Sequence, residues 1–517
     1  MEQKSAWTPK INPWYIAVIV SLAAFMELLD TSIANVALPH IAGSLGATND
    51  ESTWVLTSYL ASNAIVLPMS GWFANAFGRK RFFMVCVGLF TASSILCGLS
   101  NSLPMLILFR VLQGAGGGAL QPMAQAILAD TFPPEKRGTA FTVFGLTAVV
   151  APALGPTLGG WITDNYSWPW IFFINLPTGL LLLGMLYWVL EDPPYLKELR
   201  AAAVKMDYVG IGLLALGIAT LQVFLDKGQT LDWTNSHLIV TLMTISAISL
   251  TSLVVWEWFQ KNPVVEVRLF TNRNFWIANV LMFGTGIIMF SSIVLMPQFL
   301  QSLMGYSATK AGLVLSAAAC VMFVTFPVTA QLCGKFQGRK IIGVGAAFMA
   351  LAFAYSAART NILTLDFRAA TWLMIVQQAL IPLVWLPINL VAFVGIPQEK
   401  SNSVSGLLNF MRNMGSSVGT SIVTTLIARG SQAYQVQLVN HLTPYNPQAV
   451  AAFYGLAERL GSEQQAMATI YRAVQGQAAT LSYIHTYQVL GGILMAMILG
   501  TLLLRKNQPG GGHVSLH

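Results

Sequence analysis

Long apolar runs separated by short polar stretches recur along the whole chain. A helix needs about 20 residues to cross a hydrocarbon core of about 30 Å, and these runs reach that length without the alternation of an outer-membrane β-barrel. The pattern predicts an all-α integral membrane protein with fourteen transmembrane helices. The expected spans are residues 14–37, 52–75, 82–100, 104–128, 139–161, 168–190, 207–225, 237–257, 275–301, 310–333, 341–358, 371–394, 402–428 and 484–504.

Composition agrees with this pattern, since 55% of the residues are hydrophobic and only 9% are charged, against roughly 25% charged in soluble domains. The net charge of +8 fits the positive-inside rule better than nucleic-acid binding. The four cysteines lack metal-ligand spacing, so we expect no metal site and no disulfide framework.

No nucleotide-binding or hydrolase motif stands out. The glycine-rich stretch 114–118 lacks the lysine and Ser/Thr of a P-loop. We therefore expect no enzyme and no organic cofactor. The driving energy must come from an ion gradient, from a substrate gradient or from a separate subunit.

The lysines and arginines are distributed unevenly between the two sides of the predicted membrane. An even number of spans puts both termini on one side, which then carries nineteen basic residues against seven on the other. The positive-inside rule therefore places both termini in the cytoplasm. The long loop at about 429–483, which contains a helix-favouring segment from Gln448 onward, then lies outside, as a solvated cap or as a docking surface for a partner.

A glycine-rich stretch ending in Gly-Arg-Lys follows the second span, at 71–80, and recurs after the tenth span, at 334–340. Repeats of this kind indicate duplicated halves, which are common in transporters. We expect an N-terminal six-helix bundle at 1–190, a two-helix insert at 191–260 and a C-terminal six-helix bundle at 261–517.

Two carboxylates, Glu27 and Asp30, lie inside the first span. A charge at mid-membrane is costly and usually functional, and residues three apart share one helix face. Asp30 suits proton coupling if its surroundings alternate between apolar contacts and an arginine or water. A static ion pair or a hydrogen-bonded acid is the alternative for both residues, and Glu27 could instead attract a cationic substrate.

The fourth span carries a polar and glycine face, because Arg110, Gln113, Gly114, Gly117 and Gln121 align at helical spacing. Such a face should point to protein or water rather than to lipid.

Uncharged polar groups and aromatic residues in other spans could line a broad substrate cavity, although any one of them could equally bridge helices. The candidates are Asn35, Gln113, Gln121, Gln298, Gln377, Gln378, Trp385, Asn409, Arg412 and Asn413. Small and kinking residues predict either tight packing or a gate. The motifs expected to pack or to gate contain Gly71, Gly78, Pro152, Gly155, Pro156 and Gly159, together with the basic residue Arg79.

Taken together, the motifs resemble the major facilitator superfamily, and within it the fourteen-span drug:proton antiporters of the EmrB-like kind. The stretches that carry the resemblance are 29–39, 71–80, Arg110 with Gln113 and Gly114, 152–160, 168–177, 409–413 and the long outer loop. The chain departs from the family pattern at Asn75, where an acid is usual, at Ala76, where a basic residue is usual, and at Pro169, where an arginine is common.

The resemblance implies two six-helix bundles around a central cavity that opens alternately to each side of a bacterial inner membrane. It implies export of hydrophobic or amphipathic drugs in exchange for protons, with Asp30 as the proton site and Arg110 tuning it or relaying the proton. EmrB-like members work with a periplasmic adaptor and an outer-membrane channel. The alternatives are a dedicated exporter of one metabolite or siderophore without an adaptor, and a membrane sensor or scaffold that does not transport.

Overall fold

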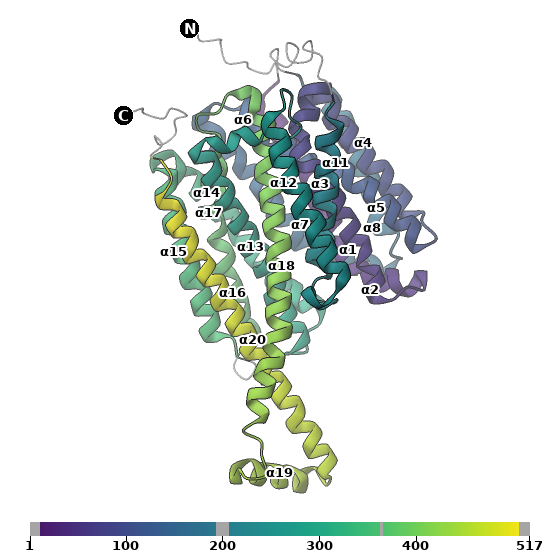
Figure 1. Ribbon diagram of the computed structural model, residues 1–517, viewed down its shortest axis with the longest axis vertical. Coiled ribbons are helices and arrows are strands. Elements are labelled where there is room, and N and C mark those ends of the chain that lie inside the picture. The colour runs from purple at the N-terminus through teal and green to yellow at the C-terminus, as the bar shows by residue number, and fades with distance from the viewer. Residues whose placement is uncertain (1–10, 193–205, 362–364, 506–517) are drawn as a thin grey trace.

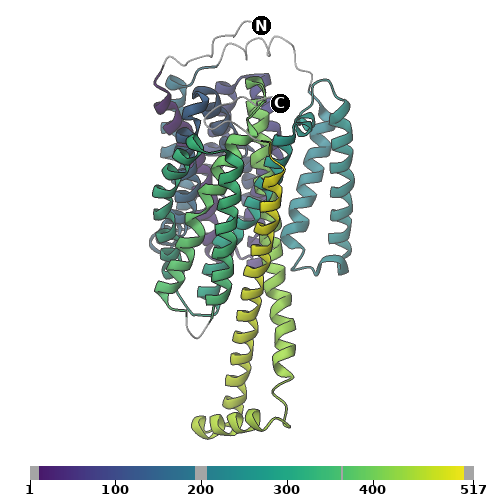
Figure 2. The same ribbon diagram turned by 90° about the vertical axis from the view of Figure 1, so that its left-hand side faces the viewer.

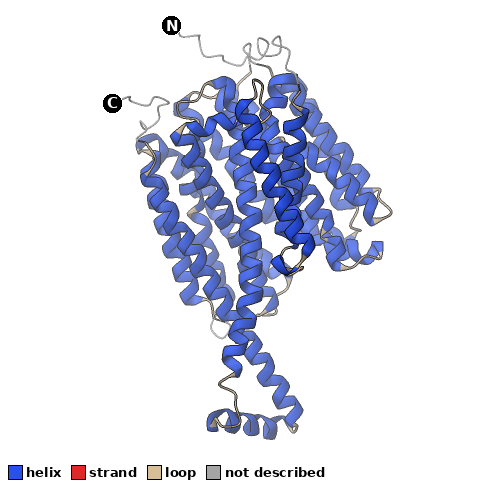
Figure 3. Ribbon diagram, viewed as in Figure 1, coloured by secondary structure: helices blue, strands red, loops and turns tan. Residues whose placement is uncertain are grey.

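The computed structural model describes residues 11–192, 206–361 and 365–505, and over these ranges the chain is helical, with no strand (Figure 3). The prediction of an all-α fold is confirmed. The long helices run side by side along the long axis of the molecule (Figure 1).

The described helices fall into three consecutive sets along the chain. The first set is α1 (Pro13–Leu45), α2 (Asn49–Ser52), α3 (Trp54–Phe77), α4 (Arg79–Gly98), α5 (Leu103–Gly117), α6 (Leu120–Thr131), α7 (Pro134–Asn165), α8 (Trp170–Phe173) and α9 (Asn175–Val189). The second set is α11 (Tyr208–Lys227) and α12 (His237–Phe259). The third set is α13 (Arg273–Ser302), α14 (Ala308–Lys335), α15 (Gly338–Arg359), α16 (Phe367–Ala379), α17 (Ile381–Ala392), α18 (Ser401–Val439), α19 (Pro447–Leu460) and α20 (Glu463–Leu502).

Three of the predicted spans are interrupted by a short break in the helix. The run 104–128 divides into α5 and α6 at its glycines, 168–190 divides into α8 and α9, and 371–394 divides into α16 and α17. Prolines explain the last two breaks, because Pro177 and Pro382 have no N–H to donate to the carbonyl four residues earlier.

Among the described residues, twelve helical segments are long and apolar enough to cross a membrane. The remaining two predicted spans, 52–75 and 402–428, correspond to α3 and α18, which are long but more polar and are not among the twelve. Both lie inside the bundle, where α3 packs on α5 and α18 packs on α13. Their polar residues therefore contact other helices rather than lipid alone.

The first and third sets of helices meet mainly where α3 packs on α18 and α7 packs on α14, and α6 also contacts α18 and α7 also contacts α17. The second set, α11 and α12, packs mainly on itself and stands at one side of the bundle (Figure 2). From this set, α11 also contacts both α3 and α18. The domain limits at 190 and 260 stay a prediction.

Helices α18 and α20 continue well beyond the rest of the bundle and carry α19 across their tip (Figures 1 and 2). We call this the projection, and we call the opposite end of the bundle, where α4, α7 and α15 begin, the basic end. At 40 residues, α20 is about 60 Å long, roughly twice the hydrocarbon thickness. Helices α18 and α20 therefore extend beyond the expected spans, which end at 428 and begin at 484.

The short helix expected in the outer loop is present as α19, and Pro447 is its first residue. The side chain of Asn446 accepts a hydrogen bond from the backbone N–H of Gln448 and caps this helix. Helix α19 packs on α20, and none of its residues is fully buried, so much of its surface is open to solvent or to a partner.

Candidate functional site

A buried ion pair joins α1 to α5 in the middle of the first set of helices. Arg110 Nη1 donates to Asp30 Oδ2 at 2.7 Å, and the two side chains are 0% and 1% exposed. The other carboxylate oxygen, Oδ1, accepts from Gln113 Nε2 at 2.9 Å and from Asn175 Nδ2 at 2.6 Å. Asp30 is thus held by one cation and two amides, which is the hydrogen bonding that a buried carboxylate requires.

Arg110 is itself fixed from several helices. Its Nε donates to the carbonyl of Val55 at 3.1 Å, and Nη1 also donates to Gln113 Oε1 at 2.8 Å. The guanidinium lies 4.1 Å from the centre of the Tyr59 ring and 5.6 Å from that of Phe172. These cation–π contacts add to the stabilisation of a charge that has little water around it.

The second acid, Glu27, is also buried, but its recorded hydrogen-bond partners are neutral. Oε1 accepts from Tyr59 Oη and from Asn63 Nδ2, both at 3.1 Å. Oε2 accepts from Gln121 Nε2 at 2.5 Å. Tyr59 therefore touches both acid sites, because its hydroxyl donates to Glu27 while its ring lies under Arg110.

Glu27 belongs to a closed ring of hydrogen bonds that crosses from the first set of helices to the third. The Gln121 side chain donates to Glu27 and accepts from Arg412 Nη2 on α18 at 2.5 Å. Arg412 Nη2 also donates to Asn413 Oδ1 at 3.5 Å, and Asn413 Nδ2 donates to Asn63 Oδ1 at 3.4 Å. We call Glu27, Asn63, Gln121, Arg412 and Asn413 the central ring.

The central ring therefore ties α18 to α1, α3 and α6. Beside it, Asn409 Nδ2 on α18 donates to Gln125 Oε1 on α6 at 2.7 Å, a second buried bond in the same direction. These contacts lie at the level of the two acids, so a change in charge at Glu27 acts directly on the interface between the two sets of helices.

The other predicted cavity residues are distributed unevenly. Gln377 is buried in the third set, where its amide bonds to Ser292 and Ser356, each at 2.6 Å. Gln378 borders a small cavity, and Trp385 stacks on Phe144. The two remaining residues, Asn35 and Gln298, are exposed and do not join the central ring.

Sequence reasoning missed Tyr59, Asn63, Asn175 and Gln125. Tyr59 and Asn63 are four residues apart on α3 and hence on one helix face, a spacing that was visible in the sequence. Asn175 lies inside an apolar run, and an uncharged amide in such a run gave no reason to prefer it over the many other polar residues.

The basic end is closed by contacts between α3, α4, α6 and α18. Arg79 Nη2 donates to Asp130 Oδ2 at 2.7 Å, and Ser401 Oγ donates to Asp130 Oδ1 at 2.8 Å. Asn402 Nδ2 donates to Asn75 Oδ1 at 3.1 Å. Asn75 thus makes a neutral contact across the interface.

Glycines permit this close approach at the basic end. A Cβ on Gly71 would lie 2.7 Å from the backbone nitrogen of Ser403, so α3 and α18 could not pack as they do with a larger residue. Gly78 joins α3 to α4 with a φ of +90°, a conformation that favours glycine.

The proline and glycine motif of α7 forms the crossing with α1. Because Pro156 has no N–H, the carbonyl of Pro152 lacks its helical donor, and Ser32 Oγ donates to that carbonyl at 3.1 Å. A Cβ on Gly155 would overlap the Ser32 side chain, and one on Gly159 would lie 3.1 Å from Ile33 Cγ2. In this conformation the motif serves as a packing surface.

Comparison with known proteins finds one protein family and several similar bacterial proteins. The profile of the Major Facilitator Superfamily matches residues 20–420. The chain is 36% identical to the multidrug export protein EmrB of Escherichia coli K12 over 96% of both chains. It is also 36% identical to the probable multidrug resistance protein EmrY of the same strain, over 96% of this chain and 95% of EmrY. It is 32% identical to the fatty acid resistance protein FarB of Neisseria gonorrhoeae, over 96% of this chain and 98% of FarB.

Solved structures share the fold at low sequence identity. A human organic anion transporter superposes with a TM-score of 0.59 at 13% identity, over 94% of this chain and all of that one. The proton:xylose symporter XylE superposes with a TM-score of 0.58 at 16% identity, over 94% of each chain.

Replacing Arg110 by methionine should strongly destabilise the protein, because Asp30 would be left buried without its cation. The expected loss is about 3 to 5 kcal/mol, seen as a lower melting temperature in detergent, whereas the double variant Asp30→Asn/Arg110→Met should recover part of it. Arg429→Met, which breaks an exposed pair with Asp232, is the matched control and should cost at most about 1 kcal/mol. A double variant no more stable than Arg110→Met alone would contradict this reading of the pair.

Cysteines at positions 75 and 402 should form a disulfide under mild oxidation, because these side chains touch across the interface at the basic end. The measurement is a mobility shift on a non-reducing gel, in a background without the four native cysteines. The single variant Asn75→Cys is the control. Absence of cross-linking in membranes would mean that the protein does not populate this closed basic end.

Proposed function

The chain belongs to the major facilitator superfamily, and from that premise we propose that it is a proton-driven exporter of hydrophobic and amphipathic compounds across a bacterial inner membrane. The similarity to the multidrug export protein EmrB, the probable multidrug resistance protein EmrY and the fatty acid resistance protein FarB supports this proposal. The fold of a membrane transporter, with twelve helical segments apolar enough to span, is that of a carrier rather than an enzyme.

The observation that carries the proposal is that both buried acids are hydrogen-bonded among helices that must move for transport. A carboxylate only accepts hydrogen bonds, whereas a protonated acid also donates one and loses its charge. A proton on Asp30 would weaken its hold on Arg110. A proton on Glu27 would disturb its three donors Tyr59, Asn63 and Gln121.

Protonation at Glu27 is linked to conformation through Gln121. If the Gln121 side chain reorients because Glu27 has become neutral, its bond to Arg412 is lost, and the hold of α18 on α6 is weakened. We therefore assign Asp30 and Arg110 as the primary proton site and the central ring as the connection between that site and the interface. Tyr59 couples the two because it contacts both.

We further propose fourteen spans, with α3 and α18 as the two polar members of the set, and both termini in the cytoplasm. The two six-helix halves would be 1–190 and 261–517, with 191–260 as the insert. On this orientation the basic end is cytoplasmic and the projection lies outside. The structure then represents a state that is closed toward the cytoplasm.

The projection supports work with an extracytoplasmic adaptor and an outer-membrane channel. It extends α18 and α20 beyond the expected membrane, and its tip α19 carries the side chains of Phe453 and Leu456 without burying any residue. An exporter of one metabolite without an adaptor is the alternative, and co-purification of an adaptor separates the two. A sensor or scaffold without transport is disfavoured by the two intact acid sites.

In proteoliposomes with an imposed pH gradient, the wild-type protein should accumulate a lipophilic dye against its gradient. Asp30→Asn should abolish the gradient-driven part and leave exchange of dye at equal pH, because an amide cannot bind and release the proton. The measurement is dye fluorescence with the gradient on and off, and Asp226→Asn on α11 serves as the matched control. An equal response of Asp30→Asn and wild type to the gradient would make Asp30 structural and leave Glu27 as the proton site.

Negative charges introduced on α19, at the tip of the projection, should abolish drug resistance of cells without abolishing transport by the purified protein. Phe453→Glu/Leu456→Glu should keep dye transport in proteoliposomes, because both residues lie outside the bundle, but should lower drug resistance of cells to that of a strain without the transporter. Glu458→Lys, on the exposed side of α19, is the control. Unchanged resistance in the double variant would favour the exporter without an adaptor.

A further inference from the structure

The projection is built from the continuous ends of two long helices. Helix α18 runs from Ser401 to Val439 and α20 from Glu463 to Leu502, and neither contains a proline, the residue at which two other spans break. Figures 1 and 2 show both helices passing from the bundle into the projection without an intervening loop. The projection is therefore a direct extension of helices that belong to the third set.

The two helices are joined where they leave the bundle. Ser482 of α20 is fully buried, and its Oγ donates to the carbonyls of Leu426 at 2.8 Å and Ile427 at 3.2 Å on α18. A Cβ on Gly430 of α18 would overlap the same Oγ atom, so a glycine permits this close approach. We call Gly430 and Ser482 the junction.

Packing on both sides of the junction fixes α20 in place. Toward the bundle, the ring of Tyr483 lies 5.1 Å from that of Phe299 on α13, and α20 also packs on α15. Toward the tip, Ala466, Val474 and Ala478 of α20 are buried, and α19 packs on α20. The projection thus has a packed interior of its own that continues into the third set of helices.

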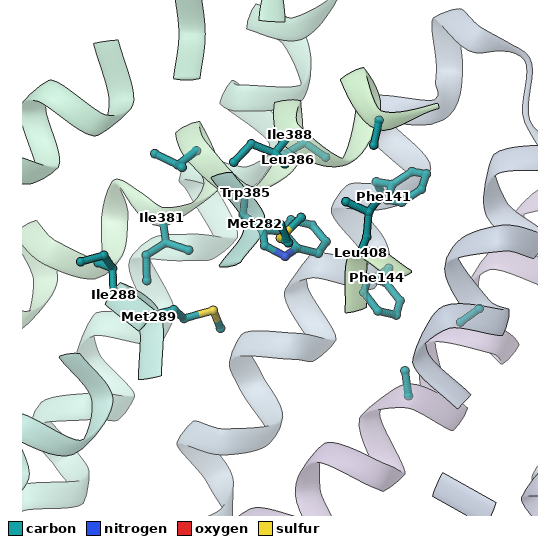
Figure 4. Close-up of a cluster of buried hydrophobic side chains, with 14 of the residues drawn as sticks. Phe141, Phe144, Met282, Ile288, Met289, Ile381, Trp385, Leu386, Ile388 and Leu408 are labelled. Atoms are coloured by element: carbon teal, nitrogen blue, oxygen red, sulfur yellow. The ribbon is translucent and has the colours of Figure 1, made fainter. Parts of the chain in front are cut away.

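Helix α18 is likewise part of the core of the bundle. Figure 4 shows its Leu408 in the buried cluster that contains Met282 of α13 and Leu386 of α17. The same helix carries Arg412, which belongs to the central ring. A rotation of the third set of helices therefore moves α18 as a whole, from the central ring to the projection.

The hydrogen bonds that join α18 to the first set of helices lie away from the projection. In the part of the chain that the structure describes, they run from Ser401 to Asn413. At the base of the projection, Arg429 pairs with Asp232, between α11 and α12, at 3.2 Å, but both side chains are exposed, and such a pair contributes at most about 1 kcal/mol. The projection is therefore free to move relative to the first set.

The length of α18 enlarges any rotation of the third set. From Arg412 to Val439 the helix is about 40 Å long, whereas the outer end of the bundle lies about 15 Å from the middle of a bilayer. A rotation of about 15° about the central ring, the size of known subunit rotations, moves the tip by about 10 Å and the outer end of the bundle by about 4 Å.

We propose that the projection is a rigid lever of the third set of helices, and that the junction transmits the rotation of this set to α19. The position of α19 then differs between the states of the transporter, and an extracytoplasmic protein bound to α19 is displaced once in each cycle. The lever rests on the proposed function for the change of state, whereas the rigidity of the projection does not depend on it.

Distances between pairs of spin labels test the lever in the full-length protein, reconstituted in nanodiscs without its native cysteines. The labels are placed at Ser102 in the first set, Gln301 in the third set and Glu458 on α19, which are all exposed. Electron–electron resonance is recorded for each pair at pH 5 and pH 8, with and without Glu27→Gln. We expect a single narrow and constant distance between 301 and 458. The distance between 102 and 458 should change by about 10 Å where that between 102 and 301 changes by about 4 Å.

Gly430→Val should disconnect the projection from the bundle, because the new side chain overlaps Ser482. The 301–458 distances should then spread over a broader range, while the 102–301 pair keeps its wild-type response. Ser482→Ala removes the two hydrogen bonds without adding atoms, so it tests the junction even if the valine variant folds poorly, and it should broaden the same distances. Gly455→Val on α19, where a Cβ meets no atom within 4 Å, is the matched control.

A broad range of 301–458 distances in the wild type, or a narrow one that both junction variants leave unchanged, would overturn the lever. A constant 102–458 distance while the 102–301 distance changes would also overturn it. A 102–301 distance that is the same under all conditions would remove the change of state and with it both the proposed function and the transmission. A narrow 301–458 distance that depends on the junction would keep the rigid projection even then, so the two failures are distinguishable.

Discussion

The cost of burying a carboxylate among membrane helices constrains this structure more than any other interaction. A buried charge needs a partner and a full set of hydrogen bonds, and the chain meets this need in two ways. Asp30 has a direct cation in Arg110, within the first set of helices. Glu27 has only neutral donors in contact, and the cation Arg412 lies beyond Gln121 on the other side of the interface.

The difference between the two acids matters for motion. The Asp30–Arg110 pair can persist while the two sets of helices separate, because all of its partners lie in one set. The central ring cannot persist, because its bonds cross the interface. The amide of Gln121 stands between Glu27 and Arg412 in place of a direct salt bridge. The contact between the two sets of helices is therefore easier to break, since hydrogen bonds through a neutral amide are weaker than a buried ion pair would be.

The third set of helices contains a neutral counterpart of the Asp30 site. Gln113 lies shortly before the break between α5 and α6, and Gln377 lies shortly before the break between α16 and α17. Gln377 bonds to Ser292 of α13 and Ser356 of α15, much as Gln113 bonds to Asp30. The arrangement thus contains a buried ion pair in the first set of helices and only neutral groups in the third.

Some of this could be predicted from the sequence, because it depends on one helix at a time. The apolar runs gave the helices, and the rarity of charges in them identified Glu27, Asp30, Arg110 and Arg412 as unusual. Helices α18 and α20 run past the predicted spans because the chain turns polar there without leaving the helix. The break at Pro382 could have been read from its missing N–H.

The partners of these residues were decided by the tertiary structure. Hydrophobic pattern locates a residue along its helix, but the packing of neighbouring helices sets the rotation of that helix about its axis. Sequence alone therefore treated Asn35 and Gln121 as equal cavity candidates, although one is exposed and the other bridges Glu27 to Arg412. It equally had no means to separate Gln377, whose amide is satisfied, from Gln378, whose amide is not, because that difference depends on which helices surround each side chain.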